Sequence, residues 1–190
     1  MSQLIRIIYI SRSTFTPSRS NVGIEPNVGR ILAKSRVNNR RNGLVGVLYF
    51  GDGCFFQCLE GEQSAIDILY ARLQSDERHK DIKLLSREPI SALSYADWAM
   101  KFVPLEKEMT RLLNAAGLQT FNPYRFDAVM VQKVMNLLRT STDTSTAPEV
   151  ETLIRQSMQA PATAKTSRVL WPIVATVIVA AVAAAIFLLR

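Results

Sequence analysis

The sequence predicts an α+β protein with a ferredoxin-like β-α-β-β-α-β-β order, followed by a helical pair, a linker and one transmembrane helix. Three observations lead to this class. Short runs of branched and aromatic residues alternate with two segments of helical periodicity across residues 4–103. Both faces of the expected strands are largely apolar, so the sheet needs a covering layer on each side. Finally, residues 169–189 form a continuous apolar stretch.

The first half of the chain is expected to form a strand, a helix and a hairpin. Residues 4–11 are rich in branched side chains and predict a strand, one face of which carries Ile7, Tyr9 and Ser11. Apolar and small residues recur at helical spacing over residues 25–39. A strand at residues 43–50 then leads through the turn sequence Gly51-Asp52-Gly53 into a partner strand that begins at Cys54.

The second half supplies the remaining elements of the sandwich. A helix is expected over residues 63–75, with Ile66, Leu69 and Leu73 buried. Residues 81–90 and 97–103 predict the last two strands. The two crossover helices cover one face of the sheet, and helical segments at 105–116 and 126–139 cover the other. The residues expected to face inward from these two segments are Leu105, Leu112, Val129, Met130, Val134 and Leu137.

The apolar stretch near the end predicts a membrane anchor. Residues 169–189 comprise 21 residues without a charge, which at ~1.5 Å per residue span roughly 30 Å, one hydrocarbon thickness. Lys165 and Arg168 precede the stretch and Arg190 follows it. The positive-inside rule therefore predicts a single-pass protein of the cell inner membrane with its N-terminal part in the cytoplasm. The expected domains are 1–104 for the sandwich, 105–139 for a helical cap, 140–168 for a Thr-, Ser-, Ala- and Pro-rich linker and 169–189 for the span.

Charge and cysteine content narrow the function. The net charge is +7, but the basic residues are scattered without an interleaved aromatic stripe, so we expect no nucleic-acid partner. Attraction to an anionic membrane or to phosphates explains the charge equally well. Cys54 and Cys58 lie four residues apart in a strand, about 13 Å, which is too far for a disulfide. With no neighbouring ligands they make no metal site, and we expect buried free thiols in a reducing compartment.

Polar side chains are expected on the sheet face under the crossover helices. An unpaired buried amide costs about 1–3 kcal/mol, so Gln57 needs a partner or a ligand. Each polar residue taken alone could be a satisfied core residue, but their convergence indicates a site for a flat polar ligand. Residue chemistry by itself stops at a polar pocket between two helices and a sheet. The residues expected on this face are Tyr9, Ser11, Gln57, Trp98 and Met100, with Ser35 and Asn39 from the first helix.

The chain resembles the BLUF family, blue-light sensors that use flavin. The resemblance covers about residues 3–103 and is carried by LIRIIYIS, ILAKSRVNNRRNGLVGVLYFGDGCFFQCLEGE, RLQSDERHKDI and DWAMKF. The region around LQTFNPYRF is similar to the C-terminal cap of short members, whereas the loop 12–23 is longer than in compact members. The family implies a photoreceptor rather than an enzyme, with FAD as its cofactor.

The resemblance also implies roles for individual residues. The flavin ring would lie between the helices at 25–39 and 63–75, with Gln57 bridging Tyr9 and the ring. Asn39 would hydrogen-bond the ring's pyrimidine edge, with Asn38 beside it. The remaining implied contacts are Ser35 close to the ring, Arg78 and His79 near its edge or the ribityl-phosphate side, and Trp98 and Met100 flanking the glutamine. Which of Trp98 and Met100 points inward stays open.

Two other functional classes stay open on the sequence. A light-silent membrane adaptor could keep the fold, although the presence of both Tyr9 and Gln57 argues against it. An acylphosphatase-like hydrolase shares the sandwich, but SRSTFTP follows the first strand in place of the phosphate loop. The signalling partner is unidentified: the output is expected to act through another protein, through self-association or at the membrane. The choice of FAD over FMN rests on the resemblance alone.

Overall fold

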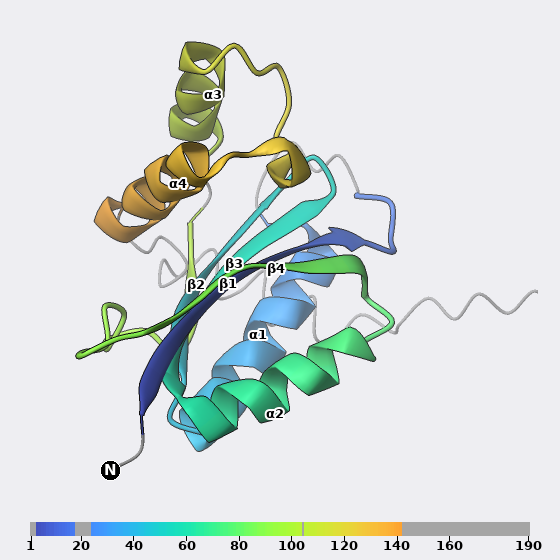
Figure 1. Ribbon diagram of the computed structural model, residues 1–190. Helices are drawn as coiled ribbons and strands as arrows, with labels where there is room; N and C mark the ends of the chain where they lie inside the picture. Colours follow the sequence, from blue (N-terminus) through green and yellow to red (C-terminus); the bar gives the residue numbers. More distant parts are fainter. Residues whose placement is uncertain (1–2, 18–23, 104, 142–190) are drawn as a thin grey trace, which may run out of the picture. The chain divides into compact units, whose positions relative to one another are not determined.

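The computed structural model describes residues 3–17, 24–103 and 105–141 (Figure 1). These residues belong to the first of two compact units, residues 1–160, and the second unit, residues 161–190, lies outside the described residues. Within the described ranges, no helix is long and apolar enough to cross a membrane. The predicted span 169–189 and nearly all of the predicted linker 140–168 lie outside these ranges. The predicted domain boundaries therefore stay predictions.

Five strands form one sheet in the order β4-β1-β3-β2-β5. The first four pair in antiparallel fashion, and β5 pairs with β2 in parallel. This arrangement confirms the predicted α+β, ferredoxin-like order with one extra strand. The strands are β1 (Leu4–Ser13), β2 (Val45–Gly51), β3 (Cys54–Glu62), β4 (His79–Pro89) and β5 (Lys101–Phe102).

Helices cover both faces of the sheet, as the apolar strands require (Figure 1). Helices α1 (Pro26–Arg41) and α2 (Gln63–Gln74) lie on one face, and α3 (Glu106–Ala115) and α4 (Ala128–Thr140) on the other. A 3₁₀ turn, Pro123–Arg125, lies between α3 and α4. Carboxylates fix two helix starts, because Glu25 accepts the Val28 amide at 2.9 Å and Asp127 accepts the Met130 amide at 2.7 Å.

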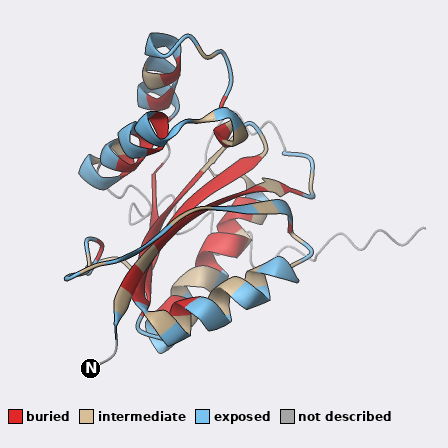
Figure 2. Cartoon of the chain, in the orientation of Figure 1, coloured by how far each residue is buried: buried red, intermediate tan, exposed pale blue. Residues whose placement is uncertain are grey.

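The sheet separates two hydrophobic cores (Figure 2). Alternate residues of β1 serve both, since Ile8 and Ile10 face the α3–α4 side whereas Ile7 and Tyr9 face the α1–α2 side. Cys54 and Cys58 are buried free thiols in the α3–α4 core, as predicted. Most residues expected to face inward from α3 and α4 do so, but Val129 is 61% exposed, which corrects its expected burial. Val129 and Met130 are consecutive residues in the first turn of α4, and neighbours in a helix lie about 100° apart around its axis, so burial of Met130 leaves Val129 facing solvent.

The last strand is much shorter than predicted. The sequence predicts a strand over residues 97–103, whereas ladder pairing is confined to Lys101 and Phe102. The backbone before them is held by other groups: Asn39 Nδ2 donates to Ala99 O at 2.7 Å and Arg36 Nε donates to Met100 O at 3.0 Å. Side chains of α1 thus replace the missing strand partners.

The β2–β3 hairpin closes through the predicted turn. Gly51 pairs with Cys54, leaving Asp52 and Gly53 as a two-residue loop with φ of +47° and +74°. Positive φ at both positions is the geometry that suits a twisted hairpin. The carboxylate of Asp52 also accepts the Phe121 amide at 2.6 Å, which ties the hairpin to the segment between α3 and α4.

The close pairing of β2 and β3 generates a stability prediction. A Cβ at Gly46 would lie 2.2 Å from the carbonyl oxygen of Cys58, so Gly46→Ala forces the two strands apart. We expect a loss of about 3 kcal/mol or more in the free energy of unfolding, measured by urea denaturation. The control Gly117→Ala has open space around its Cβ at φ +70° and should cost only the left-handed penalty, about 1–2 kcal/mol. Equal losses for both variants would contradict the steric explanation.

Candidate functional site

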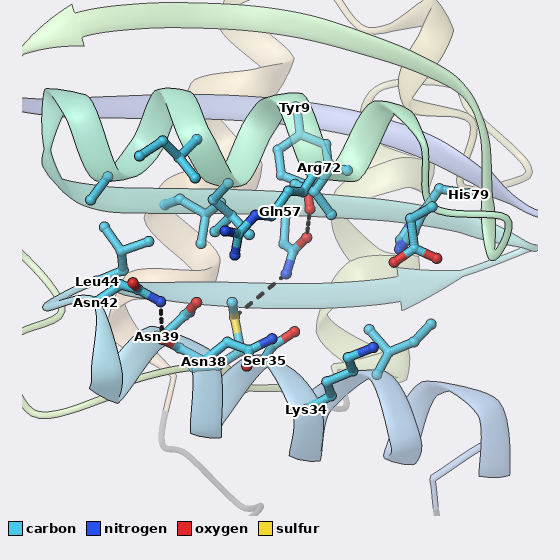
Figure 3. Close-up of a pocket in the computed structure, with 18 of the residues that line it drawn as sticks. Tyr9, Lys34, Ser35, Asn38, Asn39, Asn42, Leu44, Gln57, Arg72 and His79 are labelled. Atoms are coloured by element: carbon cyan, nitrogen blue, oxygen red, sulfur yellow. Dashed lines mark hydrogen bonds between the residues drawn. The ribbon is translucent and has the colours of Figure 1, made fainter.

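A cavity of about 740 Å³ lies between α1, α2 and the sheet (Figure 3). Its volume is within the range of pockets that hold drug-sized or cofactor ligands. Leu69 and Leu73 of α2 line it and are only half-buried, although the sequence predicts both as core residues. They are only half-buried because the cavity lies beside them, where other core side chains would otherwise pack.

The floor of the cavity holds a chain of three hydrogen-bonded side chains. Tyr9 and Gln57 are directly opposite in the β1–β3 register, so both side chains lie on the same face. The Tyr9 hydroxyl donates to Gln57 Oε1, and Gln57 Nε2 donates to Met100 Sδ at 3.7 Å (Figure 3). Burial, with smaller contributions from Asp76 and Tyr70, raises the pKa of Tyr9. The phenol therefore keeps its proton at neutral pH.

One face of α1 supplies the amide groups of the cavity. Ser35, Asn38 and Asn39 recur at helical spacing and all line the cavity. Asn39 is 1% exposed, and its Nδ2 is committed to Ala99 O. Its Oδ1 is therefore the atom free to accept a hydrogen bond from a ligand, and the hydroxyl of Ser35 and the amide of Asn38 supply further polar groups.

Arg78 and His79 also line the cavity, after the end of α2. The Arg78 guanidinium binds both carboxylate oxygens of Asp76, at 2.8 and 2.5 Å, and this hydrogen bonding lowers the pKa of Asp76 to about 2. His79 is buried against the Phe55 ring, with ring centroids 4.6 Å apart, and its Nδ1 lies 2.8 Å from Ser11 Oγ. Burial lowers the pKa of His79 to about 4, so its imidazole is neutral at neutral pH.

The placement of Trp98 corrects the sequence analysis. Trp98 packs against the α3–α4 core, whereas Met100 is 2% exposed and faces Gln57 in the cavity. The expectation that both share the cavity face assumed strand alternation over residues 97–103. That alternation is absent because the strand begins only at Lys101. Of the two residues left open, Met100 is the one that points inward.

The structure therefore brings together nearly all of the predicted site residues. Those that line the cavity are Tyr9, Ser35, Asn38, Asn39, Gln57, Arg78, His79 and Met100. Two cations that the sequence analysis missed, Lys34 and Arg72, line it as well. Helical spacing could have indicated Lys34, because it lies four residues before Asn38 and therefore on the same face of α1. Exposed cations are common on any helix, however, so the spacing alone does not single it out.

Comparison with known proteins places the chain in a family. A model of the BLUF family, described as sensors of blue-light using FAD, matches residues 4–101, just over half of the chain. The chain belongs to the BLUF family. Domains of this family bind flavin, and the family is one of sensors, in agreement with the expectation of a sensor rather than an enzyme.

The BLUF match recurs in larger light-regulated proteins. The photoactivated adenylate cyclase subunit beta of Euglena gracilis is 32% identical over 100 residues, which cover 53% of this chain and 11% of that protein. The alpha subunit from the same organism is 30% identical over 100 residues, 9% of its length. The chain thus spans about a tenth of the length of these curated relatives, 11% and 9%.

Solved structures share the fold. BlsA in its ground state superposes with a TM-score of 0.66 at 32% identity, covering 79% of this chain and 98% of BlsA. Its photo-activated state gives a TM-score of 0.64 at 33% identity, with 74% and 98% covered. A bacterial light-regulated adenylyl cyclase gives 0.52 at 28% identity, covering 70% of this chain and 36% of the cyclase.

The cavity of this BLUF chain fits a flavin ring. A flavin ring is flat, with apolar faces and a polar pyrimidine edge. The cavity offers matching groups: apolar walls from Ile31, Leu69 and Leu73, and amide and hydroxyl groups from Ser35, Asn38 and Asn39. Its polar floor is already ordered by hydrogen bonds among protein side chains.

The buried His79 generates a pH prediction. A folded-state pKa of about 4, below the ordinary 6.5, means that the folded protein resists protonating this imidazole. Its contribution to stability is complete above pH 6.5 and is lost as the pH falls toward 4, by up to about 3 kcal/mol. Urea denaturation between pH 4 and pH 8 should show this loss, and His79→Gln should remove it. Most of the Asp76 contribution is lost below pH 4, because its pKa falls from the ordinary 3.8 to about 2 in the folded protein, so it adds little to the change within this window. An unchanged slope in the variant would contradict the assignment.

Proposed function

We propose that the chain is a membrane-tethered blue-light photoreceptor that binds FAD and signals by rearranging the hydrogen bonds of Tyr9 and Gln57. The observation that carries this proposal is the ordered chain from the Tyr9 hydroxyl through the Gln57 amide to Met100 Sδ. A phenol is an oxidisable proton donor, and an amide is both donor and acceptor. Their pairing under a cavity of flavin size supports a light-driven switch more than it supports a passive core.

The lining residues suggest how the cofactor is held. Asn39 Oδ1 and the side chains of Asn38 and Ser35 are the groups we assign to the polar edge of the ring. The guanidinium of Arg78, together with the exposed Lys34 and Arg72, supplies positive charge at the same cavity. Such cations suit the phosphate of a flavin nucleotide. The choice of FAD over FMN follows the description of the family, sensors of blue-light using FAD.

The switching chemistry follows from the residue types. A bound flavin excited by blue light is a strong oxidant. Tyr9 can release an electron, and its phenolic proton has a direct path to the amide oxygen of Gln57. If the amide then turns or tautomerises, its donor and acceptor ends exchange, and Met100 loses its donor. Return of the electron and proton restores Tyr9 but leaves the hydrogen bonds exchanged. The product is a shifted conformational population rather than a converted substrate.

The output is expected to reach another protein at the membrane. The Euglena relatives are named photoactivated adenylate cyclases, and the match covers 11% of the beta subunit. By analogy, we propose that this BLUF domain controls the activity of an effector, through contact with a partner protein or with a second copy of itself. Residues 169–189 would hold the domain on the cytoplasmic side of the inner membrane, which raises its effective concentration toward a membrane-bound target.

The photoreceptor proposal is tested by colour and by two substitutions. A purified fragment ending at residue 141 should be yellow, release FAD on denaturation and show a small reversible redshift after blue light. Tyr9→Phe should bind flavin and lose the normal redshift, because the phenolic proton and the electron donor are gone. Gln57→Leu should lose it because the exchangeable amide is gone. Absorption spectra before and after illumination measure both effects.

A matched control separates the switch from burial alone. Tyr49 is a buried tyrosine on the opposite face of the sheet, and burial raises its pKa as well. Tyr49→Phe should therefore keep the redshift. A folded fragment that stays colourless with added FAD would support the light-silent adaptor or the hydrolase instead. A normal photocycle in Gln57→Leu would refute the switch.

Membrane tethering is tested by truncation. Ending the chain at residue 168 removes the predicted span and should leave the absorption spectrum and its redshift unchanged. We expect the truncated protein in the soluble fraction and the full chain in the membrane fraction, because the apolar stretch supplies the anchor. Fractionation followed by absorption spectroscopy measures both. A full-length chain that is soluble in cells would contradict the anchor, and a truncated form with full biological output would contradict the need for it.

A further inference from the structure

Helix α1 has the largest excess of positive charge among the described helices. It contains five cations and no acidic residue, whereas α3 contains two of each. Arg30, Lys34, Val37 and Arg41 follow one another at spacings of four, three and four residues, so they share one side of the helix. The side that includes the buried Leu32 lies opposite and faces the sheet. The cations are therefore gathered on the outer side of α1.

Acidic residues do not cancel this charge. Among the described residues, Lys34, Arg40 and Arg41 take part in no ion pair. Their positive potential therefore extends into solvent over about one Debye length, ~8–10 Å. The acidic residues near α1 and α2 lie at helix ends or in ion pairs: Glu25 at the start of α1, Glu62 and Glu77 just outside the ends of α2, and Asp67 and Asp76 in pairs with arginines.

Exposed aliphatic side chains lie among these cations. Val37 of α1 is 44% exposed and Ile68 of α2 is 55% exposed. Lys34 and Ile68 also line the cavity, so its mouth opens on the same surface, and Figure 3 shows Lys34 and Arg72 on the two helices that flank it. We call the residues Arg30, Lys34, Val37, Arg40, Arg41 and Ile68 the cationic surface. Cations mixed with aliphatic side chains are typical of surfaces that lie on anionic lipid.

Two further observations favour lipid over nucleic acid. Single-stranded nucleic acid is typically bound on exposed aromatic rings that stack with its bases. Helix α1 contains no aromatic residue, and Tyr70 of α2 is half-buried, with its ring centroid 6.0 Å from that of Tyr9. In addition, the predicted anchor at 169–189 follows the predicted linker 140–168. A flexible chain of that length spans roughly 30 Å, which would keep the domain close to the headgroups.

We propose that the cationic surface docks onto the headgroups of an anionic lipid bilayer. The cations of α1 lie against the lipid phosphates, and Val37 reaches the boundary with the acyl chains. The mouth of the cavity then faces the bilayer, and the α3–α4 pair, on the opposite face of the sheet, faces away from it (Figure 1). This inference goes beyond the proposed tether, because α1 is attracted to an anionic bilayer whether or not residues 169–189 cross it.

The test places a polarity-sensitive fluorophore on the cationic surface. The full chain with Val37→Cys is labelled at that thiol, since Cys54 and Cys58 are buried. It is then mixed, with removal of detergent, with vesicles of phosphatidylcholine alone or with added phosphatidylglycerol. The emission should shift to the blue only with phosphatidylglycerol, and high salt should reverse the shift. The same label at Val129→Cys, on an exposed valine of α4, should not respond. No shift at residue 37, or equal shifts at both residues, would overturn the docking.

Charge variants test whether the α1 cations drive the docking. Each cation near an anionic surface contributes about fivefold in affinity, so Arg40→Gln with Arg41→Gln should lower the ratio of docked to undocked domain by about thirtyfold. The matched control, Lys107→Gln with Lys133→Gln, removes two exposed cations from α3 and α4 and should leave the ratio unchanged. Equal losses in the two double variants would show that net charge alone binds the lipid, against the proposal.

The outcomes separate the docking from the tether and from the photoreceptor function. A chain that sediments with both kinds of vesicle but shows no shift at residue 37 keeps the anchor and overturns the docking. A chain that sediments only with phosphatidylglycerol vesicles and shifts at residue 37 supports the docking without the anchor. A shift with duplex DNA and none with vesicles would assign the surface to nucleic acid instead. The redshift after blue light, read in the same samples, tests the photoreceptor function by itself.

Discussion

The hydrogen bond between the Tyr9 hydroxyl and Gln57 Oε1 is the interaction around which the rest of the structure is arranged. Both groups are almost fully buried, at 0% and 3% exposure, so neither can be satisfied by bulk water. The bond exists because β1 and β3 pair with Tyr9 directly opposite Gln57. A slip of one residue would send the two side chains to opposite faces. Nine consecutive paired positions along these strands hold that register.

The sequence predicts what depends on periodicity and misses what depends on tertiary contacts. Alternation in β1 and β3 and helical spacing in α1 place Tyr9, Gln57 and Asn39 on one cavity without further information. Strand alternation predicts the wrong face for Trp98, because residues 98–100 are positioned by hydrogen bonds with α1 and β2. Those bonds join residues about 60 apart in the chain, a separation that no local pattern records. The sequence around an exposed cation such as Lys34 does not show whether the side chain lines a cavity or only contacts solvent.

The need to cover both sheet faces gives the α3–α4 pair a second role. The pair buries Ile8, Phe56 and Tyr49, which the opposite core cannot reach. Its polar attachments to the sheet include the Asp52 hairpin, the buried Lys101 and the Tyr124 hydroxyl, which donates to Asp81 O at 2.6 Å. The sheet between the cores is one layer thick, so a backbone shift on the cavity side is felt directly on the other side. A sandwich that is covered on both faces is therefore suited to carrying a signal across itself.

Magnitudes explain why β5 is the element that could respond. Exchanging one hydrogen bond at Met100 is worth about 1 kcal/mol, enough to change a two-state population by roughly fivefold. Strand β1 is paired with β3 at nine positions and also with β4, so a change of that size cannot move it. Strand β5 has two paired positions, and the hydrogen bonds that hold the residues before it include those from Asn39, Arg36 and the Gly46 amide. On the proposed mechanism, a free-energy change of this small size can shift β5 because few hydrogen bonds hold this strand in place.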